Sequence, residues 1–245
     1  MLKAYLRGKR RGLHAEEEQS IGLADRDLSG LEDPLTAAIF ARLTYLDPVD
    51  SWALLRGACS GPENEPIPDA PPPGPMTAEF WPRLAPGGAS TKSWVEPDVL
   101  LIWDDSVFIV EAKHISDHQK ESQWLEEILA IRAEPRFAGM SIHLIAAGGV
   151  YLEDFRKTVM GARRKLGASA PRFWSLPWRR LRVVAEDRLR ASTSARDNAI
   201  LTDMVYALEA WGYRHRLSFD SLPAATRALQ INMPLDVLLT WRTRR

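Results

Sequence analysis

Two short apolar runs joined by a polar turn constrain the fold of this chain more strongly than any other stretch. The first run covers residues 99–103, the second covers residues 107–110, and two aspartates and a serine at 104–106 lie between them. Apolar runs of this length on either side of a turn favour a β-hairpin, because the runs can be buried while the turn stays in water. We therefore expect the chain to be built around this hairpin.

Charged residues stand at one end of the expected hairpin. Asp98 opens the first run, and Glu111 and Lys113 follow the second. Side chains two residues apart on a strand point to the same face, so Glu111 and Lys113 should emerge together. Two carboxylates and a lysine that meet at a strand end are suited to metal-dependent hydrolysis of a phosphodiester.

Length and composition allow one sizeable α/β domain. The chain has 245 residues, of which 45% are hydrophobic and 26% charged, as is usual for folded proteins. Lysine plus arginine and aspartate plus glutamate both number 32, which argues against a protein that coats DNA without specificity. It argues less against an enzyme, which needs only a local basic patch. The single cysteine, Cys59, excludes an internal disulfide and a cysteine-rich zinc site.

The sequence has no feature of a membrane or secreted protein. No stretch approaches the roughly eighteen apolar residues of a membrane span, and the charged N-terminal segment lacks the apolar core of a signal peptide. We expect a cytoplasmic protein with no membrane partner. The motifs of zinc proteases, Walker-type ATPases and serine hydrolases are also missing from the text.

The chain is expected to divide into three parts. Residues 1–28 carry a basic cluster and then an acidic one, and are interpreted as a loosely ordered arm. Residues 29–215 form the main domain, and the proline-rich stretch at 61–75 is a loop within it, since proline disrupts helices and central strands. Residues 216–245 form an extension packed on the domain, with a short helix and then a strand at 237–241.

Helix and strand patterns alternate through the main domain. A first helix should begin at Asp33 and Pro34, a capping residue followed by proline at the first helical position. Ser116 and Gln119 resemble a capping box that starts a helix ending near residue 132. The remaining elements are a strand at 142–147, a helix at 152–166, a strand at 172–177, and helices at 179–190 and 199–211. This order predicts an α/β fold with a central mixed sheet flanked by helices.

The charged end of the hairpin resembles the motif of a known family. Pro97 and Asp98 are followed, thirteen residues after the aspartate, by Glu111, Ala112 and Lys113. This pattern is similar to the PD-(D/E)xK motif of the restriction-endonuclease-like nucleases. The expected order of elements over roughly residues 30–180 is similar to the common core of that family. The resemblance therefore implies a restriction-endonuclease-like core.

The resemblance also implies roles for single residues. Asp98 and Glu111 would coordinate Mg²⁺, for which Mn²⁺ can substitute, and Ala112 would be a further metal-binding position. Lys113 would position the attacking water or help to deprotonate it. Glu32 corresponds to the acidic residue on the first helix of the family, where it would contact a metal-bound water.

One position fits a branch of the family only in part. Gln123 falls where some branches carry a glutamine on the helix after the lysine strand. Those branches often have a tyrosine four residues later, and this chain has Glu127 there.

Each candidate also has a plainer interpretation. Asp98 can be a turn residue after proline, and Glu111 with Lys113 can be an exposed ion pair that contributes little. Glu32 can simply favour the positive end of a helix. Gln123 can be an exposed helix residue. Further candidates for the metal are Glu96 and Asp104.

Basic residues in the second half of the chain are candidates for contacts with the phosphates of a nucleic acid. They are Arg163, Arg164, Lys165, Arg179, Arg180 and Arg182. Runs of charge are equally typical of solvated helix faces. Trp174 and Trp178 lie among these residues and could stack on a base, although aromatic residues at such spacing are more often part of a core.

These observations lead to three hypotheses. The first is a Mg²⁺-dependent deoxyribonuclease that hydrolyses phosphodiester bonds of DNA, a class associated at family level with defence against foreign DNA and with DNA repair. The second is a nuclease-fold subunit that binds DNA or protein partners in a larger complex and has no activity alone. It is motivated by the lack of a motor motif or a sequence-reading module. The third is a purely structural α/β protein.

Overall fold

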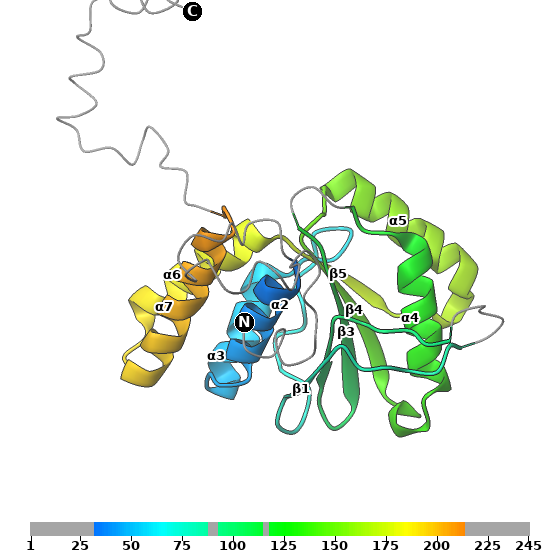
Figure 1. Ribbon diagram of the computed structural model, residues 1–245, viewed down its shortest axis with the longest axis horizontal. Coiled ribbons are helices and arrows are strands. Elements are labelled where there is room, and N and C mark those ends of the chain that lie inside the picture. Colours follow the sequence, from blue (N-terminus) through cyan, green and yellow to red (C-terminus); the bar gives the residue numbers. More distant parts are fainter. Residues whose placement is uncertain (1–31, 88–92, 115–117, 214–245) are drawn as a thin grey trace, which may run out of the picture. The chain divides into compact units, whose positions relative to one another are not determined.

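The chain folds around a five-stranded sheet, and helices cover both faces of that sheet (Figure 1). The computed structural model describes residues 32–87, 93–114 and 118–213. The predicted arm at 1–28 and the predicted extension at 216–245, with its helix and strand, lie outside the described residues.

The sheet is mixed. Its strands are β1 (Thr77–Phe80), β2 (Val99–Ile102), β3 (Ser106–Ala112), β4 (Ser141–Ala147) and β5 (Arg172–Leu176), and they lie side by side in that order. The pairs β1–β2 and β2–β3 are antiparallel, whereas β3–β4 and β4–β5 are parallel. The predicted α/β fold with a mixed sheet flanked by helices is confirmed, and β2 and β3 are the predicted hairpin.

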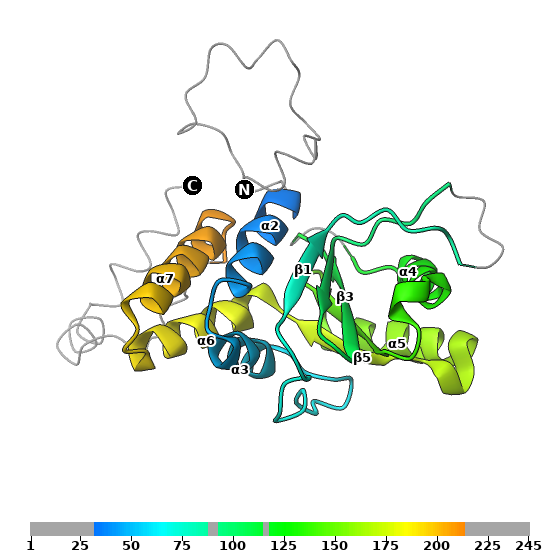
Figure 2. The ribbon, with the colours of Figure 1, turned by 90° about the horizontal axis from the view of Figure 1, so that it is seen from below.

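Two hydrophobic cores lie on opposite faces of the sheet. On one face pack α2 (Glu32–Leu43) and α3 (Pro48–Ala58), with α6 (Trp178–Ala191) and α7 (Ala195–Ala210) against them on the side away from the sheet. On the other face pack α4 (Glu121–Ala133) and α5 (Leu152–Leu166) (Figure 2). Two short 3-10 helices, η2 (Pro135–Phe137) and η3 (Gly167–Ser169), precede β4 and β5. The sheet therefore lies between helices on both of its faces.

The strand β3 forms the centre of this arrangement, and all seven of its residues are buried. Phe108 and Val110 belong to the core beneath α2 and α3, while Val107 and Ile109 belong to the core beneath α4 and α5. This is the alternation that its sequence predicts. A strand buried on both faces is expected to be apolar throughout, so the carboxylate of Glu111 near its end is an exception.

The sequence analysis missed one helix and one strand. Asp33 was predicted to cap the first helix but lies within the first turn of α2. The same residue pair, aspartate then proline, recurs at Asp47 and Pro48, where the Asp47 side chain accepts from the backbone N–H of Val49 at 2.9 Å, so α3 begins there. The missed strand β1 has four residues at the edge of the sheet and only one of them is buried, so its pattern is weak. Neither element alters the predicted fold class.

The predicted start of α4 is wrong. This helix begins at Glu121 with Lys120 as its capping residue, so no capping box starts it. Ser116 lies outside the described residues, and the Gln119 side chain bonds to other groups. The prediction failed because the pattern of a capping box is short and occurs easily in a polar loop.

The proline-rich stretch at 61–75 contains neither helix nor strand, as predicted. It connects α3 to β1 and passes close to the turn between β2 and β3, where the backbone N–H of Asp104 donates to the carbonyl oxygen of Pro73 at 3.1 Å. Among the described helices, none combines the length and the apolar character needed to span a membrane.

We predict that Gly148, directly after β4, cannot be replaced without loss of stability. Its φ is +68°, and an added Cβ would lie 2.1 Å from the carbonyl oxygen of Lys113 and 2.3 Å from Nε1 of Trp178. These two atoms are hydrogen-bonded to each other at 3.0 Å. Gly148→Ala should lower the free energy of unfolding by about 2–4 kcal/mol, because it adds a clash to the backbone strain.

Gly139→Ala is the matched control. Gly139 also has a positive φ, +81°, but an added Cβ would meet nothing within 4 Å. The free energy of unfolding of Gly139→Ala should fall by only about 1 kcal/mol, because the variant has backbone strain but no clash. Urea denaturation of both variants measures the difference, and equal losses would contradict the proposed clash.

Candidate metal centre

The register of the hairpin brings two carboxylates together. Val99 pairs with Val110 in the antiparallel ladder. The next pair in the same register is Asp98, just before β2, opposite Glu111, near the end of β3. The backbone N–H of Ala112 donates to Oδ2 of Asp98 at 2.9 Å and fixes that carboxylate at the strand end. Both side chains are buried, Asp98 with 8% and Glu111 with 0% exposure.

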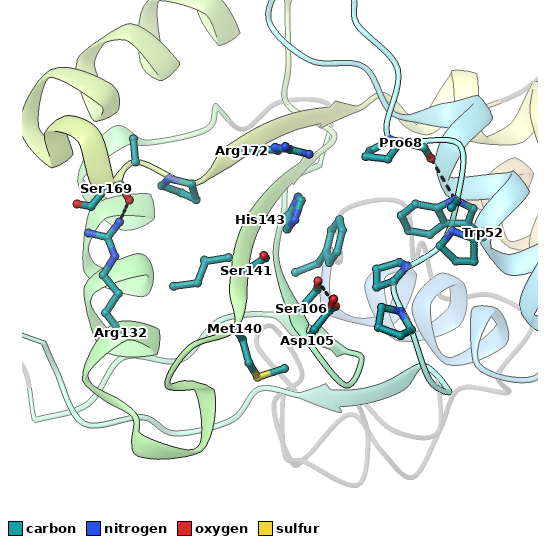
Figure 3. A pocket seen from close by; sticks show the side chains of 18 residues that line it. Trp52, Pro68, Asp105, Ser106, Arg132, Met140, Ser141, His143, Ser169 and Arg172 are labelled. Atoms are coloured by element: carbon teal, nitrogen blue, oxygen red, sulfur yellow. Dashed lines mark hydrogen bonds between the residues drawn. The ribbon is translucent and has the colours of Figure 1, made fainter.

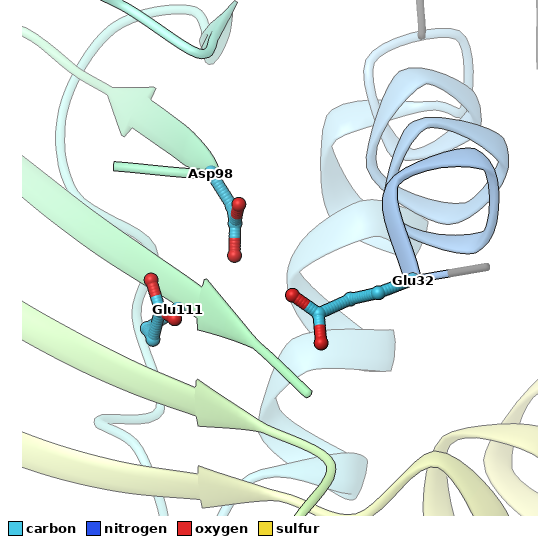
Figure 4. Close-up of side chains that lie close together, drawn as sticks. All are labelled: Glu32, Asp98 and Glu111. Atoms are coloured by element: carbon cyan, nitrogen blue, oxygen red, sulfur yellow. The ribbon is translucent and has the colours of Figure 1, made fainter. Parts of the chain in front are cut away.

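A third carboxylate comes from the first described helix (Figure 4). Glu32 is the first residue of α2, and its Oε2 accepts from the backbone N–H of His114 at 3.2 Å. One oxygen each from Glu32, Asp98 and Glu111 lie within 4.8 Å of one another. This is the one such acidic group in the part of the chain that the structure describes, and its oxygen ligands are of the type that Mg²⁺ prefers.

Lys113 supplies the positive charge of the cluster. Its Nζ donates to Oε1 of Glu111, to Oε1 of Glu32 at 3.3 Å and to the carbonyl oxygen of Ala112 at 2.8 Å. Burial disfavours the ammonium, but the carboxylates of Glu111, Glu32 and Asp98 outweigh burial and raise the pKa of Lys113. The lysine therefore stays protonated and acts as a hydrogen-bond donor.

The carboxyl groups are forced toward their neutral forms when no cation other than Lys113 is present. Burial is the main cause, and it raises the pKa of Asp98, of Glu111 and of Glu32. The negative charge of Glu111 raises the pKa of Asp98 further. A divalent cation bound among these oxygens would relieve both effects, so metal binding must compete with protons at this centre.

The sequence analysis missed a fourth carboxyl group, that of Glu127 on α4. Glu127 has 1% exposure, and a hydrogen bond links its carboxyl to that of Glu111. Burial raises the pKa of Glu127 to about 8. A signal was present in the sequence, because Glu127 shares the helical stripe of Trp124, Ile128 and Ile131, all buried on α4. A glutamate on a buried stripe needs a polar partner.

Gln119 was also missed as part of the centre. Its Nε2 donates to the carbonyl oxygens of Glu111, at 3.0 Å, and Gly148, at 3.2 Å, while its Oε1 accepts from Nε1 of Trp124 at 2.9 Å. The side chain thus joins the ends of β3 and β4 to the first turns of α4. It holds the backbone of Glu111, and no short sequence motif marks a contact of this kind.

The structure does not bring the remaining acidic candidates into the cluster. Glu96 pairs with Arg83 at 3.4 Å, and Asp104 is exposed in the turn at the other end of the hairpin. Gln123 is half-buried and bonds to Glu127, which connects it to the centre through that residue alone.

The basic candidates are spread over two helices. Arg163, Arg164 and Lys165 are exposed in the last turn of α5, roughly 20 Å along the helix from its start after β4. Lys165 pairs there with Glu121 at 2.9 Å. Arg179, exposed in the first turn of α6, is close enough to Tyr213 to affect its pKa.

The other basic and aromatic candidates make contacts within the folded domain. Arg180 is exposed but donates to the carbonyl oxygen of Gly57 at 2.9 Å. Arg182 is buried and pairs with glutamates of α6 and α7 at 2.7 and 2.8 Å, so it is not a phosphate contact. Trp174 and Trp178 are buried in the core, as the plainer interpretation held.

Comparison with known proteins does not assign the chain to a family. No family model matches the chain, and no curated protein or solved structure is detectably similar to it.

We predict that the metal-free protein loses stability as the pH rises, and that Glu127 contributes to the loss. Its pKa is about 8 in the folded protein against an ordinary value of 4.5. The stability from its bound proton is fully present below the ordinary value and is lost as the pH rises through about 8. Asp98 and Glu111 act in the same direction because their pKa values are also raised.

Glu127→Gln removes this titration and keeps the shape of the side chain. Urea denaturation in EDTA between about pH 5 and about pH 8 should show a smaller fall in unfolding free energy for this variant than for wild type. Glu153→Gln, at an exposed position on α5, is the control and should follow wild type. Identical slopes in all three proteins would contradict a protonated Glu127.

Proposed function

We propose that this protein is a divalent-metal-dependent nuclease that hydrolyses phosphodiester bonds of DNA. The observation that carries the proposal is the convergence of Glu32, Asp98 and Glu111 around the ammonium of Lys113 at the end of β3. The proposal includes a restriction-endonuclease-like core. It is supported by a first helix that supplies Glu32, a hairpin that supplies the other three residues, and the β3–α4–β4 crossover that follows.

The donor set fits a hard divalent cation such as Mg²⁺ or Mn²⁺. Asp98 and Glu111 would hold the ion, with Glu32 and the carbonyl oxygen of Ala112 at the same edge. Oε2 of Glu111 is buried and, the carboxyl of Glu127 apart, has no hydrogen-bond partner among the described residues, so it can serve as a ligand atom for a cation. When bound, such an ion supplies charge neutralisation for the phosphate and a lower pKa for an attacking water.

Lys113 orients the nucleophile and does not abstract its proton. Its raised pKa keeps the ammonium charged, and a charged amine can only donate hydrogen bonds. In the described structure it neutralises Glu111 and Glu32. Once a cation shares those carboxylates, the same three N–H donors can hold a water or a phosphate oxygen in line for attack.

Glu32 completes the geometry from the helix side. Its Oε2 is held by the backbone N–H of His114, and its Oε1 faces Lys113. A carboxylate fixed in this way can accept a hydrogen bond from the attacking water and align its lone pair. On the substrate side, Arg179 is the basic candidate whose helix begins beside the centre, since Nε1 of Trp178 bonds to the Lys113 carbonyl.

We predict that wild type cleaves DNA in Mg²⁺ or Mn²⁺ and that two variants do not. Asp98→Asn removes a metal ligand and Lys113→Met removes the donor, so each should lower the cleavage rate by about 100-fold or more. Asp104→Asn, in the exposed turn, is the control and should retain activity. Linear, circular and single-stranded DNA, with RNA alongside, are the substrates.

If wild type and Asp98→Asn behave alike on every substrate, the catalytic proposal is wrong. An inactive wild type that co-purifies with an obligate partner would favour the second hypothesis, a subunit without activity of its own.

We also predict that Mg²⁺ or Mn²⁺ raises the thermal unfolding temperature of wild type. A cation at 100 times its Kd stabilises the folded state by about 2.7 kcal/mol. Because the carboxyl pKa values are raised, metal binding releases protons and should tighten with increasing pH. Asp98→Asn should lose the metal effect while keeping a metal-free unfolding temperature no lower than wild type, since the amide is neutral at every pH and burial favours the neutral form. A metal effect that survives this change would place the ion elsewhere.

A further inference from the structure

A second polar site, the cavity drawn in Figure 3, lies at the opposite end of β3 from the candidate metal centre. A cavity of about 600 Å³ opens where the three parallel strands begin, and it is lined by Ser106, Ser141 and Arg172, the first residues of β3, β4 and β5. The carboxylates of the metal centre stand at the other ends of these strands. The cavity is therefore independent of the proposed nuclease centre.

The floor of the cavity is a row of side chains across the three strands. Phe108 pairs with His143, and His143 pairs with Arg172, so the three side chains share one face of the sheet. The rings of Phe108 and His143 are stacked with centroids 4.1 Å apart and planes 8° apart. This stacking fixes the orientation of the histidine.

The opposite wall is built from Trp52 of α3 and the proline-rich loop. Nε1 of Trp52 donates to the carbonyl oxygens of Pro68 and Asp69 at 3.2 Å each, which ties the loop to the helix. Pro71, Pro72 and Pro73 also line the cavity. Proline loses little backbone freedom on binding, so this wall is preformed.

His143 presents one defined hydrogen-bond donor to the cavity. Its Nδ1 accepts from Nε1 of Trp174 at 3.1 Å, so the proton of the neutral ring is on Nε2. Burial, followed by the positive charge of Arg172, lowers the pKa of His143 to about 4, and the ring is neutral at pH 7. Within the described residues, Nε2 has no hydrogen-bond partner.

The charges around this donor favour an anion. Arg172 is exposed on the edge strand and forms no ion pair within the described ranges. Arg132 also lines the cavity and donates to the carbonyl oxygen of Ser169. One carboxylate, that of Asp105, is at the same edge and accepts from the hydroxyl of Ser106 at 2.6 Å. Two cations and one anion leave an excess of one positive charge.

We propose that this cavity binds a small organic anion. Its carboxylate or phosphate group is held by the guanidinium of Arg172 and the Nε2–H of His143, and its planar or apolar body lies against Phe108, Trp52 and the prolines. A volume of about 600 Å³ accommodates a molecule of mononucleotide size. The stacking and the bond to Trp174 keep the histidine donor pointing at the ligand, although the residues that the structure describes give Nε2 no partner.

Four probes separate the parts of this proposal. Adenosine 5′-monophosphate carries a phosphate on a planar body, and indole-3-acetate carries a carboxylate on one. Adenosine has the body alone and inorganic phosphate the anion alone. Calorimetric titration of the full chain, together with the indole N–H resonance of Trp174, measures binding. At least one of the first two probes should bind, and more tightly than both fragments.

Arg172→Gln tests the anion contact without disturbing the core, because Arg172 is exposed. Binding should weaken about 10-fold or more, the effect of losing one charge-assisted hydrogen bond. Arg163→Gln removes one charge from an exposed position on α5 and should bind as wild type does. Asp98→Asn should also bind normally, since the metal centre is separate.

Three results would overturn the proposal. One is the absence of binding by both anionic probes at millimolar concentration. Another is measurable binding of adenosine that is as tight as that of its monophosphate. The third is unchanged affinity in Arg172→Gln. None of these results bears on DNA cleavage, so the anion-binding proposal and the nuclease proposal are tested independently.

Discussion

The burial of several carboxyl groups around one ammonium is the constraint on which the rest of this structure depends. Asp98, Glu111 and Glu127 are almost fully buried, yet among the described residues Lys113 is the one cation within the cluster. Charge cannot be left uncompensated in such a setting, so either protons or an added cation must balance it. The raised pKa values and the capacity for a metal ion are thus two results of the same burial.

The fold fixes this cluster by backbone contacts from several elements. The N–H of Ala112 holds Asp98, the amide of Gln119 holds the carbonyl of Glu111, and Nε1 of Trp178 holds the carbonyl of Lys113. The N–H of Lys113 in turn donates to the carbonyl oxygen of Ala147 at 2.7 Å, which continues the ladder beyond β3. Each charged side chain therefore starts from a backbone that cannot shift freely. This rigidity is what an arrangement of ligands needs if it is to bind a cation without reorganising.

What the sequence could predict follows from how local each signal is. The hairpin and the meeting of Asp98, Glu111 and Lys113 depend on strand period and register, which are readable over about twenty residues. Glu32 could be proposed because a resemblance supplied the long-range contact that its own neighbourhood does not reveal. Gln119 donates hydrogen bonds to backbone carbonyls at the ends of two strands, and no residue pattern in the sequence predicts such contacts. Glu127 could have been found, since a carboxyl on a buried helical stripe contradicts the apolar pattern around it. The resemblance directed attention to the missing tyrosine and away from the glutamate in its place.

The balanced net charge of the chain bears on how a DNA phosphate would reach this centre. On the proposed nuclease function, a DNA phosphate would approach three carboxylates, which repel it when ionised, while within the described cluster Lys113 attracts it. A divalent cation held by these carboxylates would reverse the local sign, so on this proposal the metal would be needed for substrate approach as well as for chemistry. A strongly basic chain would attract DNA whether or not the centre were loaded. With equal numbers of acidic and basic residues, long-range attraction of DNA would be weak, and on the nuclease proposal the local field of a metal-loaded centre would decide where a phosphate can lie.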